Sequence, residues 1–303
     1  ATAMSWAAES SRVTNQSPGV LDACRYWAAI LLAALEGTPK PGKPPSGTPV
    51  SSGTGADLGG LSPDIFPGYT LLREIHRGGQ GVVYQALQKS TKKKVAIKVL
   101  REGPFASSKD RVRFEREVEI LGQLNHPNIV AVQDSGALPP DKGGLHYFVM
   151  DYISGRSLDA YLAESNLTVQ KVIALFAKIC DAVNSAHLKG VIHRDLKPSN
   201  IRVDSSGEPH VLDFGLAKVA INDLTDGSTP EFVTVTGQFI GSLAWASPEQ
   251  AEMSAAKIDT RTDVYSLGVM LYAALTGRFP YAVLGNMRDV LESLGHFFAH
   301  ESC

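Results

Sequence analysis

Short runs of strand-forming residues precede longer runs with helical spacing, so the chain is predicted to hold a sheet first and helices afterwards. Between residues 69 and 100, three apolar runs are separated by turn residues. The predicted strands are Tyr69–Ile75, Val82–Leu87 and Lys94–Leu100. A Gly-rich turn joins the first two, which indicates a hairpin. A further pair of strands is predicted between Val130 and Met150.

Three other segments have the spacing of helices. From Lys109 to Leu124, apolar residues recur every three or four positions, which predicts a helix with one buried face. Thr168 can cap a second helix that runs to about Leu188. Residues 262–275 are apolar on nearly all sides, so they are predicted to form a buried helix.

One carboxylate falls on the apolar face of the first predicted helix. That face is formed by Phe114, Val118, Leu121 and Leu124. Glu117 lies within it, and a buried carboxylate is costly unless it is paired. We therefore expect Glu117 to form an ion pair with Lys98, which lies on the third predicted strand.

Residues 1–68 differ in composition from the rest of the chain. Residues 1–36 are interpreted as a short helical segment, because Val20 to Leu35 is rich in Ala and Leu. Its uninterrupted apolar run is too short to span a bilayer, so local packing is favoured over a membrane-surface or partner-binding helix. Residues 37–68 are dense in Pro, Gly, Ser and Thr, which predicts a flexible linker before a domain over residues 69–303.

Length, charge and cysteine usage narrow the class of protein. The 303 residues leave room for one large domain or two small ones. A net charge of -2 argues against a nucleic-acid partner bound through its phosphates. The cysteines are Cys24, Cys180 and Cys303. Their odd number and lack of metal-type spacing favour a reducing compartment. With no membrane span or secretory signal pattern, we expect a cytoplasmic protein.

Side chains suited to metal and phosphate chemistry gather between residues 193 and 213. Asp195 offers a carboxylate, Lys197 a cation and Asn200 an amide oxygen, and Asp213 adds a second carboxylate. Such a set suits the holding of a divalent metal and a polyphosphate near a hydroxyl that must lose a proton.

A predicted hairpin brings two of these groups together. Ile201–Asp204 and His210–Leu212 are predicted to be short strands about a turn at residues 205–207. Asn200 and Asp213 then lie at neighbouring ends of the same hairpin, which would place both proposed metal ligands at one site.

The order and spacing of these residues resemble the catalytic motifs of protein kinases. The sequence HRDLKPSN at residues 193–200 matches H-R-D-L-x-x-x-N, and DFG at 213–215 follows it. VAIK at 95–98 lies upstream of both. The ending SPEQ at 247–250 is similar to that of bacterial kinases of the eukaryotic type. The resemblance covers residues 69–291.

The resemblance implies an α+β, two-lobed fold. A small antiparallel sheet with one helix would form the N-lobe over about residues 69–150. A mainly helical C-lobe would occupy about residues 151–303 and be shorter than the family's at its end. The arginine that normally pairs with Glu249 has no clear counterpart there, so this carboxylate is expected to lack its usual partner.

The resemblance also implies roles for the catalytic residues. Asp195 would orient the substrate hydroxyl and accept its proton, and Lys197 would neutralise charge on the transferred phosphoryl group. Lys98 would contact the phosphates and pair with Glu117. The metal ligands would be Asn200 and Asp213, for Mg²⁺ or, as an alternative, Mn²⁺.

A nucleotide site is implied by the same resemblance. ATP would lie under the Gly-rich loop and against the segment that links the lobes. Its expected contacts are Ile75, Gly78, Gly79, Gly81, Val83, Ala96, Lys98, Met150, Asp151 and Ile153. His76 departs from the G-x-G-x-x-G-x-V pattern, because it stands where the first glycine is expected.

The function implied is transfer of the γ-phosphoryl group of MgATP to serine or threonine of proteins. Lys197 favours this substrate class over tyrosine, and autophosphorylation in trans is an additional possibility. One alternative is a catalytically impaired module that binds nucleotide or a partner. A kinase for small molecules is a second alternative, which the SPEQ segment and the long stretch before it disfavour.

Overall fold

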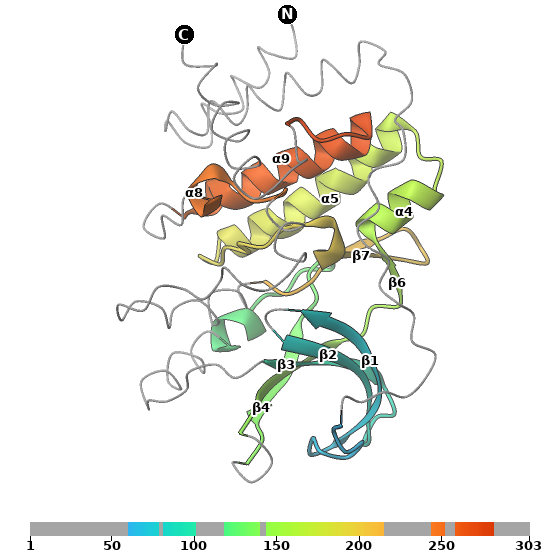
Figure 1. Ribbon diagram of the computed structural model, residues 1–303, viewed down its shortest axis with the longest axis vertical. Helices are drawn as coiled ribbons and strands as arrows, with labels where there is room; N and C mark the ends of the chain where they lie inside the picture. The colour runs from blue at the N-terminus through green and yellow to red at the C-terminus, as the bar shows by residue number, and fades with distance from the viewer. Residues whose placement is uncertain are drawn as a thin grey trace, which may run out of the picture.

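The computed structural model describes residues 60–78, 81–100, 118–139, 144–214, 244–251 and 258–281. Figure 1 shows these residues as two parts, a twisted sheet at one end and a group of helices at the other. A small second sheet lies between them (Figure 1).

The larger sheet has five antiparallel strands in the order β1-β2-β3-β5-β4. Its strands are β1 (Tyr69–Gly78), β2 (Gly81–Gln88), β3 (Lys94–Leu100), β4 (Val132–Ala137) and β5 (His146–Asp151). The three strands predicted before residue 100 are confirmed, and the pair expected between Val130 and Met150 is β4 with β5.

The two faces of this sheet belong to two apolar clusters. Because side chains alternate along a strand, Ala96 and Leu100 of β3 join the cluster that continues into the helical part. Val95, Ile97 and Val99 point the other way, into a separate cluster of the sheet. Lys98 shares its face with Ala96, so the register directs this lysine toward the second part of the molecule.

The residues before β1 close the outer face of the sheet. Phe66 is completely buried, and its ring meets that of Tyr147 edge-on at 4.7 Å between centroids. Leu61 and Ile65 pack against the same cluster. Residues 60–68 therefore belong to the folded sheet and not to the linker that composition predicted up to residue 68.

The second part is built on two long helices that pack side by side, α5 (Val169–His187) and α9 (Thr260–Thr276) (Figure 1). Thr168 caps α5 as predicted, by accepting a hydrogen bond from Lys171 N at 3.4 Å. Gly277 ends α9 in the left-handed conformation, with φ of 71°. As its composition predicted, α9 is buried along most of its length.

Shorter elements complete this part. They are β6 (Gly155–Ser157), α4 (Leu158–Glu164), η2 (Pro198–Asn200), β7 (Ile201–Asp204), β8 (Pro209–Val211) and α8 (Pro248–Ala251). Strands β6, β7 and β8 form the small sheet. The predicted hairpin of β7 and β8 is confirmed, with Ile201 opposite Val211.

The helix predicted from Lys109 to Leu124 is described only at its end. Residues 118–122 are helical, and Leu121 and Leu124 are buried in the larger cluster as predicted. Glu117 and the earlier residues lie outside the described ranges. Within those ranges, no helix combines the length and apolar character needed to cross a bilayer.

We predict that Phe66→Ala lowers the free energy of unfolding by about 3–5 kcal/mol, because it removes a fully buried aromatic ring from a packed cluster. Urea denaturation followed by tryptophan fluorescence measures the change. Leu72→Ala is the matched control, since Leu72 on the same sheet is 37% exposed. A loss for Phe66→Ala no larger than that of the control contradicts the assignment of residues 60–68 to the fold.

Candidate functional site

Asp195 lies at the centre of a compact group of polar side chains. Lys197 Nζ is 2.8 Å from Asp195 Oδ2 and 3.0 Å from Oδ1. Asn200 Nδ2 donates to Asp195 O at 2.7 Å and to Oδ2 at 3.1 Å. All three side chains are only half-buried, so one carboxylate is held by a cation and an amide while part of it stays open to solvent.

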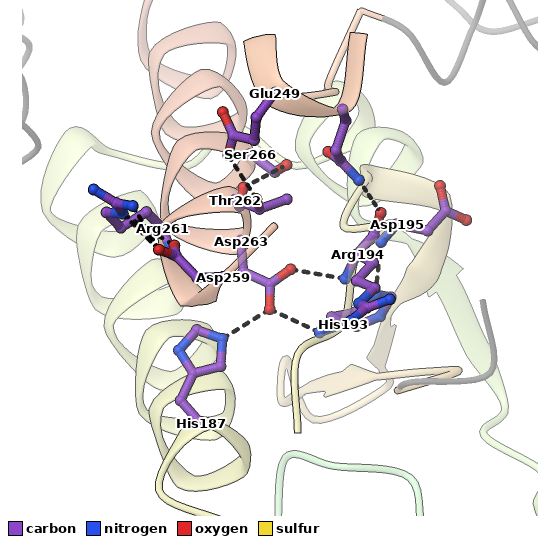
Figure 2. Close-up of polar contacts among 11 residues, drawn as sticks. His187, His193, Arg194, Asp195, Glu249, Asp259, Arg261, Thr262, Asp263 and Ser266 are labelled. Atoms are coloured by element: carbon purple, nitrogen blue, oxygen red, sulfur yellow. Dashed lines mark hydrogen bonds and ion pairs between the residues drawn. The ribbon is translucent and has the colours of Figure 1, made fainter. Parts of the chain in front are cut away.

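A buried carboxylate from α9 fixes the backbone before Asp195. Asp263 is fully buried and accepts hydrogen bonds from His193 N at 2.8 Å and Arg194 N at 2.9 Å (Figure 2). His187 Nε2, at 2.7 Å, donates to the same carboxylate (Figure 2). Three donors therefore compensate for the burial of this charge, as a buried carboxylate requires.

The backbone at Arg194 is held in a sparsely populated conformation. Its φ of 67° lies in the left-handed region, which a residue with a side chain seldom adopts. The hydrogen bond to Asp263 holds the Arg194 amide in place. Such a conformation persists only where the surroundings over-determine it.

An ion pair joins the larger sheet to the segment after β8. Lys98 Nζ, almost completely buried, lies 2.9 Å from Asp213 Oδ2. Burial favours the neutral form of Asp213, but the charge and hydrogen bond of Lys98 outweigh it and lower the carboxyl pKa below its ordinary value. Asp213 is therefore a carboxylate at neutral pH, placed where two parts of the molecule meet.

Asn200 and Asp213 come from the two ends of the β7–β8 hairpin. Leu212 N donates to Asn200 O at 2.9 Å. This hydrogen bond joins the residue before β7 to the residue after β8. His193 Nε2 is bonded to Leu212 O at 2.7 Å. The His193 and Phe214 rings are 4.9 Å apart between centroids. The prediction that this hairpin brings the two residues to neighbouring positions is confirmed.

Several of the residues expected to contact the nucleotide lie opposite one another on neighbouring strands of the larger sheet. Val83 pairs with Lys98, and Ala96 pairs with Met150, so these four side chains lie on one face of β2, β3 and β5. Ile75 on β1 is half-buried. The structure thus groups most of the expected side chains on the sheet face directed toward Asp213.

The Gly-rich turn leaves no room for a side chain at one position. Gly78 pairs with Gly81 and closes the β1–β2 hairpin. A Cβ at Gly81 would lie 2.1 Å from Val99 O, and the φ of Gly81 is 153°. Gly79, which stands between them in sequence, lies outside the described residues.

The segment that links the two parts begins at Asp151, whose side chain is held by hydrogen bonds. Asp151 Oδ1 accepts hydrogen bonds from Lys93 Nζ at 2.6 Å and Gln133 Nε2 at 2.7 Å. The Asp151 side chain is therefore engaged by the sheet. Ile153, two residues on, packs against the larger apolar cluster.

Some contacts were not foreseen from the sequence. His187, for which no role was predicted from the sequence, donates to the Asp263 carboxylate that holds the backbone of residues 193 and 194. Glu249, whose usual arginine partner has no clear counterpart in the sequence, accepts a hydrogen bond from Thr262 Oγ1 at 2.6 Å (Figure 2). A hydroxyl on α9 was not considered as a partner for this carboxylate.

Known proteins share this combination of sequence and fold. A family model described as a protein kinase domain matches residues 69–298. The serine/threonine-protein kinase PknB of Mycobacterium leprae is 39% identical over 220 residues, which are 72% of this chain and 34% of that protein. PknB of Mycobacterium tuberculosis is 40% identical over 205 residues, 67% of this chain and 32% of that protein.

A probable serine/threonine-protein kinase of Clostridium acetobutylicum is 37% identical over 215 residues, 70% of this chain and 30% of that protein. The chain thus spans about a third of the length of the curated relatives it matches. Together with the antiparallel sheet and the helical second part, these matches confirm the predicted α+β, two-lobed fold and the resemblance to bacterial kinases of the eukaryotic type.

His76, the departure from the glycine pattern, faces the charged groups of the site. It pairs with Val83, which pairs with Lys98, so the three residues form one row across β1, β2 and β3. His76 is exposed at the surface, but partial loss of water around it lowers the pKa of His76, as do the nearby charges of Lys197 and Lys98. Asp213 acts in the opposite direction.

We predict that the pKa of His76 responds to substitutions at the site. Lys197→Met should raise it toward its ordinary value, because a cation that repels the protonated ring is removed. Asp213→Asn should lower it further, because an attractive charge is lost. NMR titration of the imidazole C2 proton measures both shifts, with His76→Gln to assign the resonance. An unchanged pKa in both variants places the ring away from these groups.

Proposed function

Because this chain belongs to the protein kinase family, we propose that it transfers the γ-phosphoryl group of ATP to serine or threonine hydroxyls of protein substrates. One observation carries the proposal. The buried Lys98–Asp213 pair and the half-buried group of Asp195, Lys197 and Asn200 are brought to one region by the β7–β8 hairpin. Phosphoryl transfer requires such positioned charges more than it requires covalent chemistry from the protein.

The donor set fits a nucleotide with a divalent cation. Mg²⁺ is usually held by one or two carboxylates, with phosphate oxygens and waters completing its shell. Asp213 and Asn200 would supply one carboxylate and one amide oxygen, with Mn²⁺ as an alternative metal. Among the described residues, no group of three or more His, Cys, Asp and Glu side chains is placed to bind a metal.

The sheet supplies the rest of the nucleotide site. Lys98 would contact the phosphates, and the Gly-rich turn with Gly78, Gly79 and Gly81 would let backbone amides approach them. Adenine would lie between the side chains of Ile75, Val83, Ala96 and Met150 and the backbone of Asp151 and Ile153. Glycine at position 81 is required by the sheet itself, since a Cβ there would lie against the backbone of Val99 on β3.

Asp195 is proposed to orient the acceptor hydroxyl and take its proton. Its carboxylate is held from one side by Asn200 and from the other by Lys197, and stays open to solvent. Lys197 would stabilise negative charge on the transferred group, and a metal held by Asn200 and Asp213 would supply further positive charge there. Glu117 would pair with Lys98, although it lies outside the described residues.

Serine and threonine are the proposed acceptors. The relatives at 37–40% identity are named serine/threonine-protein kinases, and Lys197 has the position typical of that class. Autophosphorylation in trans is proposed as well. A cytoplasmic site of action accords with the use of ATP and with Cys180, which is free. No observation favours the impaired module over the active enzyme.

We predict that Asp195→Asn lowers kcat by at least about 100-fold, because it removes the proton acceptor without changing side-chain size. Transfer of label from γ-labelled ATP to a generic Ser/Thr protein substrate measures kcat, and MgADP binding by calorimetry shows that the nucleotide site persists. Phosphoamino-acid analysis identifies the acceptor.

Three outcomes contradict the proposal in different ways. Nucleotide binding without transfer by the wild type supports the impaired module. Label that appears on an aminoglycoside, and on no protein, supports a small-molecule kinase. Undiminished transfer by Asp195→Asn removes Asp195 from its proposed role.

A further inference from the structure

Gln250 on α8 reaches the backbone of the residue that precedes Asp195. Its Nε2 donates to Arg194 O at 2.5 Å, across 56 positions of sequence. Its Oε1 accepts from Ser247 N at 3.1 Å. The orientation of the amide is thus fixed from both ends, because a backbone N–H needs an acceptor and a carbonyl needs a donor. Ser247 itself is completely buried.

Both backbone groups of Arg194 are therefore held by side chains. Its N–H is bonded to Asp263 on α9, and its C=O is bonded to Gln250 on α8. Between these two contacts the residue adopts its left-handed conformation. Left-handed backbone is unfavourable for a residue with a Cβ, so external contacts are needed to maintain it.

The carbonyl that Gln250 holds belongs to the peptide unit that leads into Asp195. This unit is planar and rigid, so fixing its oxygen also fixes the direction of the Asp195 N–H and the place of the Asp195 Cα. The Asp195 N–H is directed at His193 Nδ1, 3.3 Å away. A rotation of this peptide plane would move the Asp195 carboxylate relative to Lys197 and Asn200.

We propose that Gln250 is a positioning residue for phosphoryl transfer, which sets the Arg194–Asp195 peptide plane and through it the direction of the Asp195 carboxylate. The inference rests on the proposed kinase function and adds a residue to it. Among the described residues, the hydrogen bonds of Gln250 go to Ser247 and Arg194 and not to the proposed nucleotide residues, so it is expected to act on the transfer step and not on nucleotide affinity.

Gln250→Glu separates the two contacts of the side chain. It keeps the length and the oxygen that accepts from Ser247 N, but it replaces the donor by an oxygen facing Arg194 O. Gln250→Leu removes both contacts and does not place a second oxygen against Arg194 O, so it introduces no repulsion between oxygens. Tyr281→Phe is the matched control, because Tyr281 Oη anchors the same segment through a different backbone carbonyl, Ala244 O at 2.7 Å.

We expect Gln250→Glu to lower kcat about tenfold, which corresponds to ~1.4 kcal/mol of transition-state stabilisation. The KM for ATP and the Kd for MgADP should stay within about twofold of the wild type, because a contact that matters only in the transition state changes kcat and not the binding of the nucleotide. Gln250→Leu should lower kcat similarly. Tyr281→Phe should lower Tm and leave kcat unchanged.

The outcomes distinguish this inference from the function on which it rests. A wild type that transfers phosphate, with Gln250→Glu at undiminished kcat, overturns the role of Gln250 alone. A loss of kcat that follows the loss of Tm across all three variants, Tyr281→Phe included, shows a structural role and overturns it too. A wild type that binds MgADP without transfer overturns the proposed function itself.

Discussion

The burial of one charge, the carboxylate of Asp263, is the constraint on which the site depends. A fully buried carboxylate is tolerated only when donors surround it, and here they are two backbone N–H groups of the catalytic loop and the imidazole of His187. Satisfying that charge therefore dictates where residues 193 and 194 lie. The stability of the helical part and the geometry of the loop are two results of the same hydrogen bonds.

The larger sheet contributes Lys98 to the site, and the pairing of its strands decides on which face this side chain lies. Because Val83, Lys98 and Phe148 are paired across three strands, the Lys98 ammonium must leave the sheet on the face that meets the helical part. There it finds Asp213, which the β7–β8 hairpin delivers from the other side. Each half of this ion pair would be a costly buried charge alone, so the pair links the two parts of the fold.

Much of this could be predicted from the sequence, because the determining signals are local. Strand-forming runs predicted the order β1 to β3, and the spacing of Asn200 and Asp213 about a short hairpin predicted their proximity. Long-range contacts escaped prediction. Composition assigned Phe66 to a linker, although its ring, together with Leu61 and Ile65, packs the segment against an open face of the sheet. The partner of Glu249 was missed for a similar reason, since Thr262 has no pattern that marks it as a donor.

The contact least accessible to sequence reasoning is the one between Gln250 and Arg194. A glutamine on a short helix has no distinctive spacing, and the feature it stabilises, a left-handed arginine, is itself invisible in sequence because glycine is the usual sign of that conformation. Two hydrogen bonds together account for this conformation. Gln250 on α8 holds the C=O of Arg194, and Asp263 on α9 holds its N–H. The backbone that leads into Asp195 is thus held by α8 and α9, whereas Lys98 and the glycine turn belong to the larger sheet. In the proposed reaction, nucleotide binding and phosphoryl transfer would therefore depend on separately anchored groups, which meet at Asp213.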